Sequence, residues 1–131
     1  MLLTEIAAYL QAEGLGTLNT SIFFSLPDTP DNVIVVYQNP GETGYHVRGR
    51  ANPVIELPRF QIVVRDKSAA NAYVRCERIY RALDGVSGVL AGVGYLRIAA
   101  LQPPFFLNSD ESGRTSVTNN YRVSKELSPI P

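Results

Sequence analysis

Residues 59–84 read RFQIVVRDKSAANAYVRCERIYRALD, and this stretch predicts a strand that leads directly into an amphipathic helix. Apolar and polar side chains alternate over residues 59–66, which is the pattern of a strand with one buried face. Ser68 can cap the helix with its hydroxyl, and Gly85 ends it after Asp84. The expected inward side chains are Phe60, Ile62 and Val64 in the strand and Ala72, Cys76, Ile79, Tyr80 and Leu83 in the helix, with Gln61 and Arg65 facing outward. Two matching apolar faces imply a helix packed on a sheet.

A further strand is expected soon after this helix, at residues 95–102. Its inward side chains would be Leu96, Ile98 and Ala100. The small residues between helix and strand predict a simple connection. We therefore expect strands 59–66 and 95–102 to run parallel, joined by a right-handed crossover through the helix.

The N-terminal part predicts a short helix and two more strands. The helix spans residues 4–13, with Thr4 as its N-cap and Gly14 as its stop. Alternating apolar residues predict a strand at 21–26. A run that is apolar on both faces predicts an interior strand at 33–37.

Two segments are expected to be loops, and the end of the chain is expected to fray. Residues 39–53 hold three glycines and two prolines among polar residues, which predicts a flexible loop. Residues 108–114 read NSDESGR and lie between the strand-like runs 105–107 and 115–125, which predicts a hairpin. The final SPIP at 128–131 predicts a frayed tail.

Together these elements predict one α+β domain over residues 1–131, in which residues 1–19 form the N-terminal helix and its connection. The expected architecture has two layers, a mostly antiparallel sheet with the helices packed on one face, and contains one β-α-β unit. A chain of 131 residues that is 45% apolar can bury one hydrophobic core without metals or disulfides.

Charge and composition exclude several classes of protein. Twelve basic residues balance twelve acidic ones, so no overall field attracts DNA or an anionic membrane, and any nucleic-acid contact would have to come from a local patch. Cys76 is the only cysteine and cannot form an intrachain disulfide. The first residues lack signal-peptide features, and no apolar run approaches the ~20 residues of a membrane span. We expect a protein made in a reducing cytoplasm, with no membrane partner.

No group of residues predicts catalysis, a cofactor or a metal site. His46 is the only histidine and lies in the glycine-rich segment, where its geometry as a base or ligand would not be fixed. Cys76 lies on the apolar stripe of the helix and is expected to be a buried, inert thiol. The glycines after Asp84 follow a helix, whereas a phosphate-binding loop precedes one. The clustered acidic residues all fall in predicted turns, at Asp28, Asp31, Asp110 and Glu111. The sequence therefore predicts that the protein is not an enzyme.

Arginines and aromatic residues favour contact with other molecules. The outward side of the main helix carries arginines at Arg75, Arg78 and Arg81. This row is either a solvated face or a contact for acidic or phosphate groups of a partner, since the planar guanidinium suits both. The phenylalanines expected to be partly exposed are Phe23, Phe105 and Phe106. Exposed aromatic side chains suit subunit association.

Several phrases carry a resemblance that spans nearly the whole chain. They are LPDTPDNVIVVY at 26–37, PRFQIVVRD at 58–66, YVRCERIYRAL at 73–83, QPPFFL at 102–107, DESGR at 110–114 and YRV at 121–123. In this order, after a short N-terminal helix, they resemble the tail terminator proteins of long-tailed bacteriophages, also labelled minor capsid or head–tail joining proteins. The resembling phrases include no active-site residues.

The resemblance implies a structural virion protein at the head-proximal end of the tail. Proteins of this family form a ring, commonly a hexamer, on the last disc of the tail tube. The ring stops polymerisation of the tube protein and presents a docking surface for the neck or connector of the head. Genomic DNA passes through the lumen without specific binding. The family fold, a sheet covered on one side by helices, agrees with the layers expected above.

A closed ring uses two different patches on each subunit, and the two predicted loops could become ordered on touching tube or neck. The candidate interface residues are Gly41, Tyr45, His46, Arg48, Arg50, Arg75, Arg78, Arg81, Asp110, Glu111 and Arg114. One alternative is another head–tail connector, such as a head-closure protein, or a minor tail protein. A third is a small nucleic-acid- or ligand-binding domain, which predicts a basic face and salt-sensitive binding.

Overall fold

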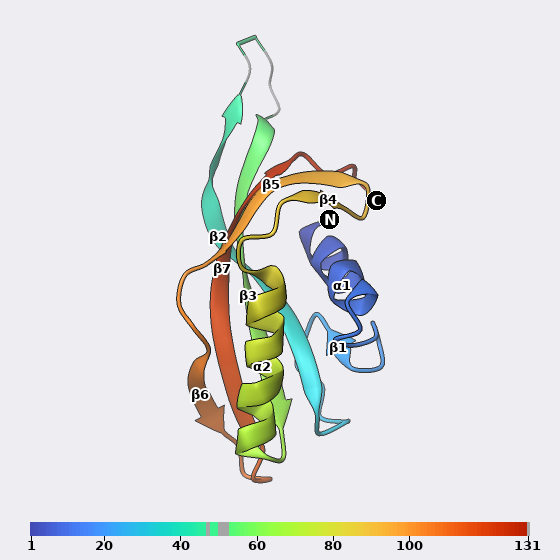
Figure 1. Cartoon of the computed structure of the whole chain (residues 1–131), viewed down its shortest axis with the longest axis vertical. Coiled ribbons are helices and arrows are strands. Elements are labelled where there is room, and N and C mark those ends of the chain that lie inside the picture. Colours follow the sequence, from blue (N-terminus) through green and yellow to red (C-terminus); the bar gives the residue numbers. More distant parts are fainter. Residues whose placement is uncertain (47, 50–52, 131) are drawn as a thin grey trace.

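The computed structural model describes residues 1–46, 48–49 and 53–130, and this part of the chain forms two helices and one curled seven-stranded sheet (Figure 1). The elements are α1 Leu2–Ala12, β1 Ile22–Phe23, β2 Val33–His46, β3 Pro53–Asp66, α2 Ala69–Leu83, β4 Gly88–Leu90, β5 Val93–Ala100, β6 Phe105–Ser109 and β7 Thr115–Glu126. The strand order is β1-β2-β3-β7-β5-β4, and β6 also pairs with β7. Among these strands only β1 and β2 pair in parallel. The predicted mixed α/β fold with a mostly antiparallel sheet is confirmed.

The predicted strand and helix at residues 59–84 form β3 and α2, because their two apolar faces meet. Ser68 caps α2 by accepting the backbone N–H of Asn71 at 3.3 Å. The Phe60 ring stacks on Tyr121 of β7 with 4.8 Å between ring centroids. The buried residues are Phe60, Ile62, Val64, Ala72, Cys76, Ile79 and Leu83, whereas Tyr80 is half-buried. Full burial of a large apolar side chain contributes roughly 1.5–3 kcal/mol, which stabilises α2 on the sheet.

β3 and β5 run parallel, as predicted, but they are not neighbours. β7 lies between them and pairs antiparallel with both, through Gln61 and Asn120 on one side and Ile98 and Val123 on the other. The β-α-β unit therefore places β3 and β5 two positions apart in the sheet, and β7 occupies the position between them.

The N-terminal helix and the strand after it differ in their bounds from the prediction. α1 begins at Leu2, and Thr4 lies inside its first turn, where the hydroxyl donates to the carbonyl of Met1 at 2.9 Å. Thr4 is therefore not the N-cap. β1 is only Ile22–Phe23, and Leu26 is exposed, because β1 pairs with β2 for two residues and the chain then turns away.

The segment predicted as a loop, 39–53, is mostly strand. Residues 39–46 continue β2, and their pairing with β3 keeps them extended despite their glycines. Gly41 lies at a bulge where a Cβ would be 2.3 Å from the carbonyl oxygen of Leu57, so a larger residue would force the strands apart. We call residues 42–46 and 53–57 the arm. The far end of the arm stands clear of the rest of the chain in Figure 1.

A bulge also changes the inward face of β5. The pairing register with β7 shifts between Tyr95 and Arg97. Tyr95 is buried and Leu96 is exposed, so the prediction that Leu96 faces the core is wrong. Ile98 and Ala100 keep the predicted side.

Buried side chains lie on both faces of the sheet. The large cluster joins residues of both helices to the α2-facing side of the sheet. A small cluster of Val33, Val35 and Val63, with Phe23 and Tyr37 packed against it, lies on the opposite face. Because the sheet is curled and partly covered on both faces, the arrangement with helices on one face only stays a prediction.

Candidate interaction surfaces

The arm carries the first group of predicted interface residues. The structure places Tyr45 and His46 at the end of β2 and Arg48 just beyond it, all exposed, whereas Arg50 lies outside the described residues. Tyr45 is 64% exposed, which is high for an aromatic side chain. His46 is solvated as predicted, although it lies in a strand rather than in a loop. An exposed aromatic side chain at the end of a strand suits contact with another protein.

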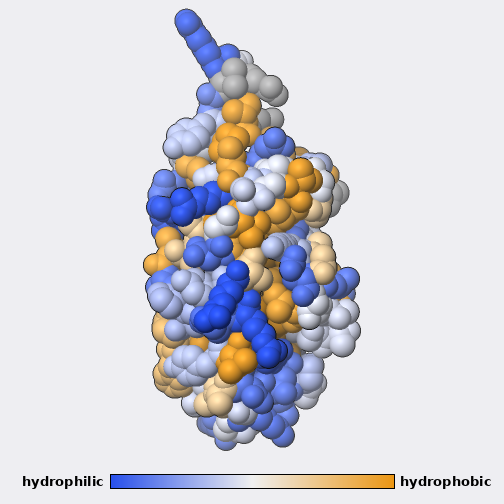
Figure 2. All heavy atoms as spheres, viewed as in Figure 1, coloured by the Kyte–Doolittle hydropathy of each residue, from blue (hydrophilic) through white to orange (hydrophobic). Residues whose placement is uncertain are grey.

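The arginines of α2 divide into two kinds. Arg75 is half-buried, and its guanidinium lies 3.2 Å from the carboxylate of Asp66. Arg81 is exposed and pairs with Glu77 at 3.1 Å, and Arg78 is exposed. Figure 2 shows hydrophilic side chains gathered over α2. Both Arg78 and the exposed Arg81–Glu77 pair are accessible to a partner, whereas the charge of Arg75 is used inside the fold.

The predicted hairpin between β6 and β7 is confirmed, and Arg114 fastens it internally. Its guanidinium donates to the Asp110 carboxylate at 2.6 Å and to the carbonyl of Asp28 at 2.6 Å, and lies 3.4 Å from the Asp31 carboxylate. The pKa of Asp110 is lowered mainly because its carboxylate accepts a hydrogen bond from the backbone N–H of Arg114. The guanidinium of Arg114 lowers this pKa further. Arg114 is buried, whereas Glu111 is exposed, and the role of both in an interface stays a prediction.

Arg65 was predicted to face solvent but is buried. It donates to the backbone carbonyls of Asp28, Pro30 and Asp31 at 3.3, 2.7 and 3.0 Å. Its position on the face away from α2 agrees with the predicted alternation. The turn over residues 28–31 covers it, so its role is to hold that turn.

A buried charged network joins the two ends of the described chain. The Glu5 carboxylate accepts hydrogen bonds from the Met1 ammonium, Tyr95 and Ser128 at 2.9, 2.7 and 2.7 Å. Lys125 is fully buried, and its ammonium lies 3.5 Å from this carboxylate. Burial raises the pKa of Glu5, but the three hydrogen bonds and the Lys125 charge outweigh it, so the net pKa is lowered. Ser128, part of the predicted frayed tail, is thus tied to the fold.

The only thiol lies in the core, as predicted. Cys76 is buried on α2 and its Sγ lies 3.6 Å from the side-chain oxygen of Asn119. Burial, with a smaller effect of the Glu77 charge, raises the pKa of this thiol to about 12. A thiol that stays protonated and covered is not a nucleophile. Within residues 1–46, 48–49 and 53–130, no three His, Cys, Asp or Glu side chains gather as a metal site.

The strand β6 is exposed along its whole length. It pairs with β7 on one side, and its five residues are all exposed. Phe105, Phe106 and Leu107 are 40%, 53% and 42% exposed, as the sequence predicted for the two phenylalanines. Apolar side chains on an uncovered edge strand are a template for association with another chain.

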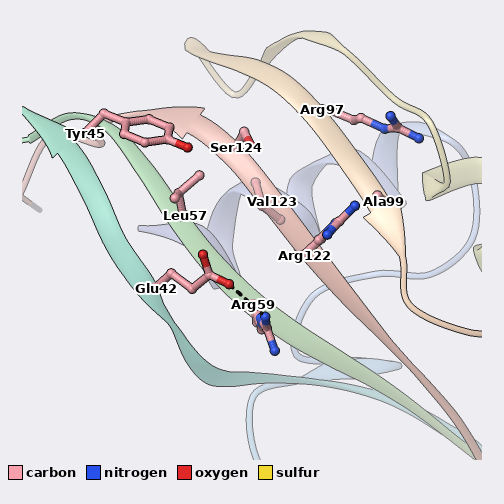
Figure 3. A pocket seen from close by; sticks show the side chains of 9 residues that line it. All are labelled: Glu42, Tyr45, Leu57, Arg59, Arg97, Ala99, Arg122, Val123 and Ser124. Carbon is pink, nitrogen blue, oxygen red and sulfur yellow. Dashed lines mark hydrogen bonds and ion pairs between the residues drawn. The ribbon is translucent and has the colours of Figure 1, made fainter.

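Three arginines that sequence analysis did not single out meet on the sheet face that points away from α2 (Figure 3). We call this the open face. Arg59 of β3 is directly opposite Arg122 of β7, and Arg97 of β5 is opposite Ser124, two positions from Arg122. They line a hollow of about 250 Å³, with Tyr45 at its rim. We call this hollow the arginine cleft.

A signal for the arginine cleft exists in the sequence. Arg59 directly precedes the buried Phe60, and Arg122 directly follows the buried Tyr121. Because side chains alternate along a strand, both arginines must face away from the core. Alternation from the buried Ile98 likewise turns Arg97 to the open face. Alternation does not reveal the order of the strands. Arg59, Arg122 and Arg97 lie on neighbouring strands only because β7 lies between β3 and β5.

Comparison with known proteins identifies the class of this chain. A family model described as "Bacteriophage tail terminator protein" matches residues 9–127. The chain belongs to the bacteriophage tail terminator family. This tail terminator is also similar to a chain in the solved structure "Virion of native gene transfer agent (GTA) particle", with a TM-score of 0.67, 17% identity, and coverage of 96% of this chain and 95% of that one. That likeness shows a shared fold. The search of curated proteins found no match.

The family and the matched structure agree on the kind of protein. The tail terminator family is one of structural phage virion proteins, and the solved relative comes from a virion particle. The tail terminator is therefore a structural protein of the virion. Neither helix of its described part is long and apolar enough to cross a bilayer.

Proposed function

We propose that copies of this tail terminator form a ring, in the simplest case a hexamer, that caps the tail tube at its head-proximal end. The ring stops polymerisation of the tube protein and docks the tail to the neck or connector, and genomic DNA passes through its lumen. Family membership supports the class of protein. The observation that carries the ring itself is the uncovered apolar strand β6.

β6 has the properties of a subunit contact. Proteins that stay monomeric usually protect an edge strand with charges, prolines or a covering element. Here the two prolines, Pro103 and Pro104, precede the strand, and the strand itself presents Phe105, Phe106 and Leu107 to solvent. Burying this cluster against a second copy would remove the exposed apolar area that makes the isolated chain prone to association.

A closed ring also needs a second, different patch that receives the first. The arm supplies a candidate, because Tyr45, His46 and Arg48 are exposed at the other end of the molecule from β6 (Figure 1). Contacts between unlike patches at opposite ends close into a ring when the rotation between copies is correct. Arg78, Arg81 and Glu111 then remain candidates for the surfaces that meet tube or neck.

The ring is tested by comparing two charge insertions at exposed apolar positions. Phe106→Lys places a charge in the proposed contact, and Val89→Lys places the same charge on β4, where Val89 is 75% exposed. Native mass spectrometry and negative-stain imaging should show rings for the parent chain and for Val89→Lys, and monomers for Phe106→Lys. Rings that survive Phe106→Lys unchanged would remove β6 from the interface.

The position in the virion is tested on assembled particles. With the Phe106→Lys chain in place of the parent, we expect abnormally long tails that do not join heads, because nothing stops the tube. Tails of normal length with a failure only of head attachment would instead favour the alternative of a head-closure connector.

A further inference from the structure

The arginine cleft concentrates positive charge that the rest of the fold does not balance. Within the described residues, Arg97 and Arg122 take part in no ion pair, and Arg59 is paired only with Glu42, at 3.1 Å. That pair is exposed on both sides and so contributes little. Arg59 and Arg122 lie directly opposite each other on β3 and β7. Like charges in such positions destabilise a sheet. An unbalanced cluster of this kind in a chain of zero net charge points to an external anion.

The dimensions of the cleft favour an extended anion over a single small one. The arginines come from three adjacent strands, β3, β7 and β5, which together span roughly 10 Å at the usual strand spacing. A nucleic-acid strand carries one phosphate per 3.4 Å of helix axis, so roughly two or three phosphates fit this row. The hollow of about 250 Å³ holds the volume of about eight water molecules, more than one small ion needs.

The chemistry of the lining also suits a phosphate backbone. Each guanidinium offers a planar fork of donors that matches phosphate oxygens. Tyr45 stands at the rim, where its exposed ring can stack on a base or sugar. The three strands under the cleft are hydrogen-bonded on both sides, β3 to β2 and β7, β7 to β3 and β5, and β5 to β7 and residues 85–88, so a peptide has little free backbone to pair with.

We propose that the arginine cleft binds the phosphodiester backbone of nucleic acid without reading its sequence. Arg97 and Arg122 supply the two unpaired charges, Arg59 a third once it leaves Glu42, and Tyr45 a stacking surface. The inference does not require the ring, because the cleft is complete within one copy. Failure of phosphate binding and failure of ring formation are therefore separate results.

The test measures binding of the full chain to fluorescent 20-nucleotide single strands and 20-base-pair duplexes of unrelated sequence by fluorescence anisotropy. We expect similar affinity for different sequences and a slope of log K against log salt of about −2 to −3, which corresponds to three phosphates. The double variant Arg97→Gln and Arg122→Gln should bind at least tenfold more weakly. The slope of log K against log salt should become shallower by about 2.

A matched variant removes the same charge from the other face. Arg78→Gln combined with Arg81→Gln on α2 should leave binding within twofold. Equal losses in both double variants would overturn the proposal, because attraction would then follow net charge and not the cleft. Thermal unfolding by circular dichroism checks that each variant folds, and Arg59→Gln provides an independent third substitution for which a smaller loss is expected.

Competition separates the possible anions. Inorganic phosphate should displace the oligonucleotide only at concentrations at least a hundredfold above that of unlabelled DNA. A polyglutamate peptide that competes as well as DNA would overturn the proposal in favour of an acidic protein segment. Displacement by free phosphate at the DNA concentration would show a small-anion site instead. Native mass spectrometry of the Arg97→Gln and Arg122→Gln chain should still show the same assembly as the parent.

Discussion

The two faces of the central sheet use the same strands for opposite purposes. On the α2-facing side, β3 and β7 present Phe60, Ile62 and Tyr121, all fully buried. On the open face the same strands present polar residues beside the small valine cluster: Gln61 donates to the Thr118 hydroxyl at 2.9 Å, and Arg59 of the arginine cleft lies two residues before Gln61. The α2-facing side therefore carries the large core, whereas the open face combines a small apolar cluster with arginines that have no strong partner within the fold. Substitutions on the two faces should differ accordingly.

The largest effect is expected at Tyr121. Tyr121→Ala removes a fully buried ring that stacks on Phe60 and accepts a hydrogen bond from Asn119 at 2.7 Å. The free energy of unfolding, measured by urea titration, should fall by about 3–5 kcal/mol. Tyr121→Phe keeps the ring and should lose only about 1 kcal/mol. A loss below 1 kcal/mol for Tyr121→Ala would mean that this face does not carry the core.

Arg65 should be the exception on the open face. Arg65→Ala leaves the carbonyls of Asp28, Pro30 and Asp31 without their buried donor. We expect a loss of about 2–3 kcal/mol in urea unfolding, because buried acceptors without partners are costly. Arg97→Ala on the same face is the control and should change stability by less than about 0.5 kcal/mol. Equal losses of unfolding free energy in the two variants would show that Arg65 does not stabilise the fold more than the exposed Arg97 does.

Acid should weaken the charged network that lies on the α2-facing side. The pKa of Glu5 is lower in the folded chain than its ordinary value of 4.5, so its contribution to stability is complete above that value and is lost as pH falls through the folded pKa. We expect the unfolding free energy to decline below pH 4 by an amount that depends on this carboxylate. Glu5→Gln should be less stable at neutral pH and should show a shallower decline in acid. An identical acid slope in both chains would contradict the assignment.

The smallest effect should have the opposite sign. Arg122→Gln relieves the repulsion from Arg59 directly across the strands. The unfolding free energy at low salt should rise by about 0.2–1 kcal/mol, and the gain should shrink at high salt. A loss of stability would indicate that Arg122 has an internal partner after all.

Local patterns in the sequence predicted those elements whose stability comes from alternation and capping. The strand at 59–66, the helix capped by Ser68 and the hairpin before Thr115 all follow from residues within a few positions of each other. The extension of β2 beyond Asn39 was missed because its glycines resemble a loop, whereas pairing with residues 53–57 of β3 holds it extended. Leu96 was placed inward because a bulge has no reliable local signature.

The candidate surfaces were likewise predicted where local sequence determines them and missed where the fold does. Exposure of Phe105 and Phe106 followed from composition, and Arg78 and Arg81 followed from the helical repeat. The internal contacts of Arg114 could not be predicted, because Asp28 and Asp31 lie more than eighty residues away and only the fold brings them together. The arginine cleft depends on β7 lying between β3 and β5, which is a property of topology and not of any short segment.

The position of β7 has a consequence for the timing of synthesis. The strand in the middle of the sheet is synthesised after all the other described strands, and β3 and β5 have no common neighbour until it is present. A nascent chain can form the β2–β3 hairpin and α2, but not the finished sheet. A chain that ended before β7 would leave the facing edges of β3 and β5 unpaired and β6 without its partner strand.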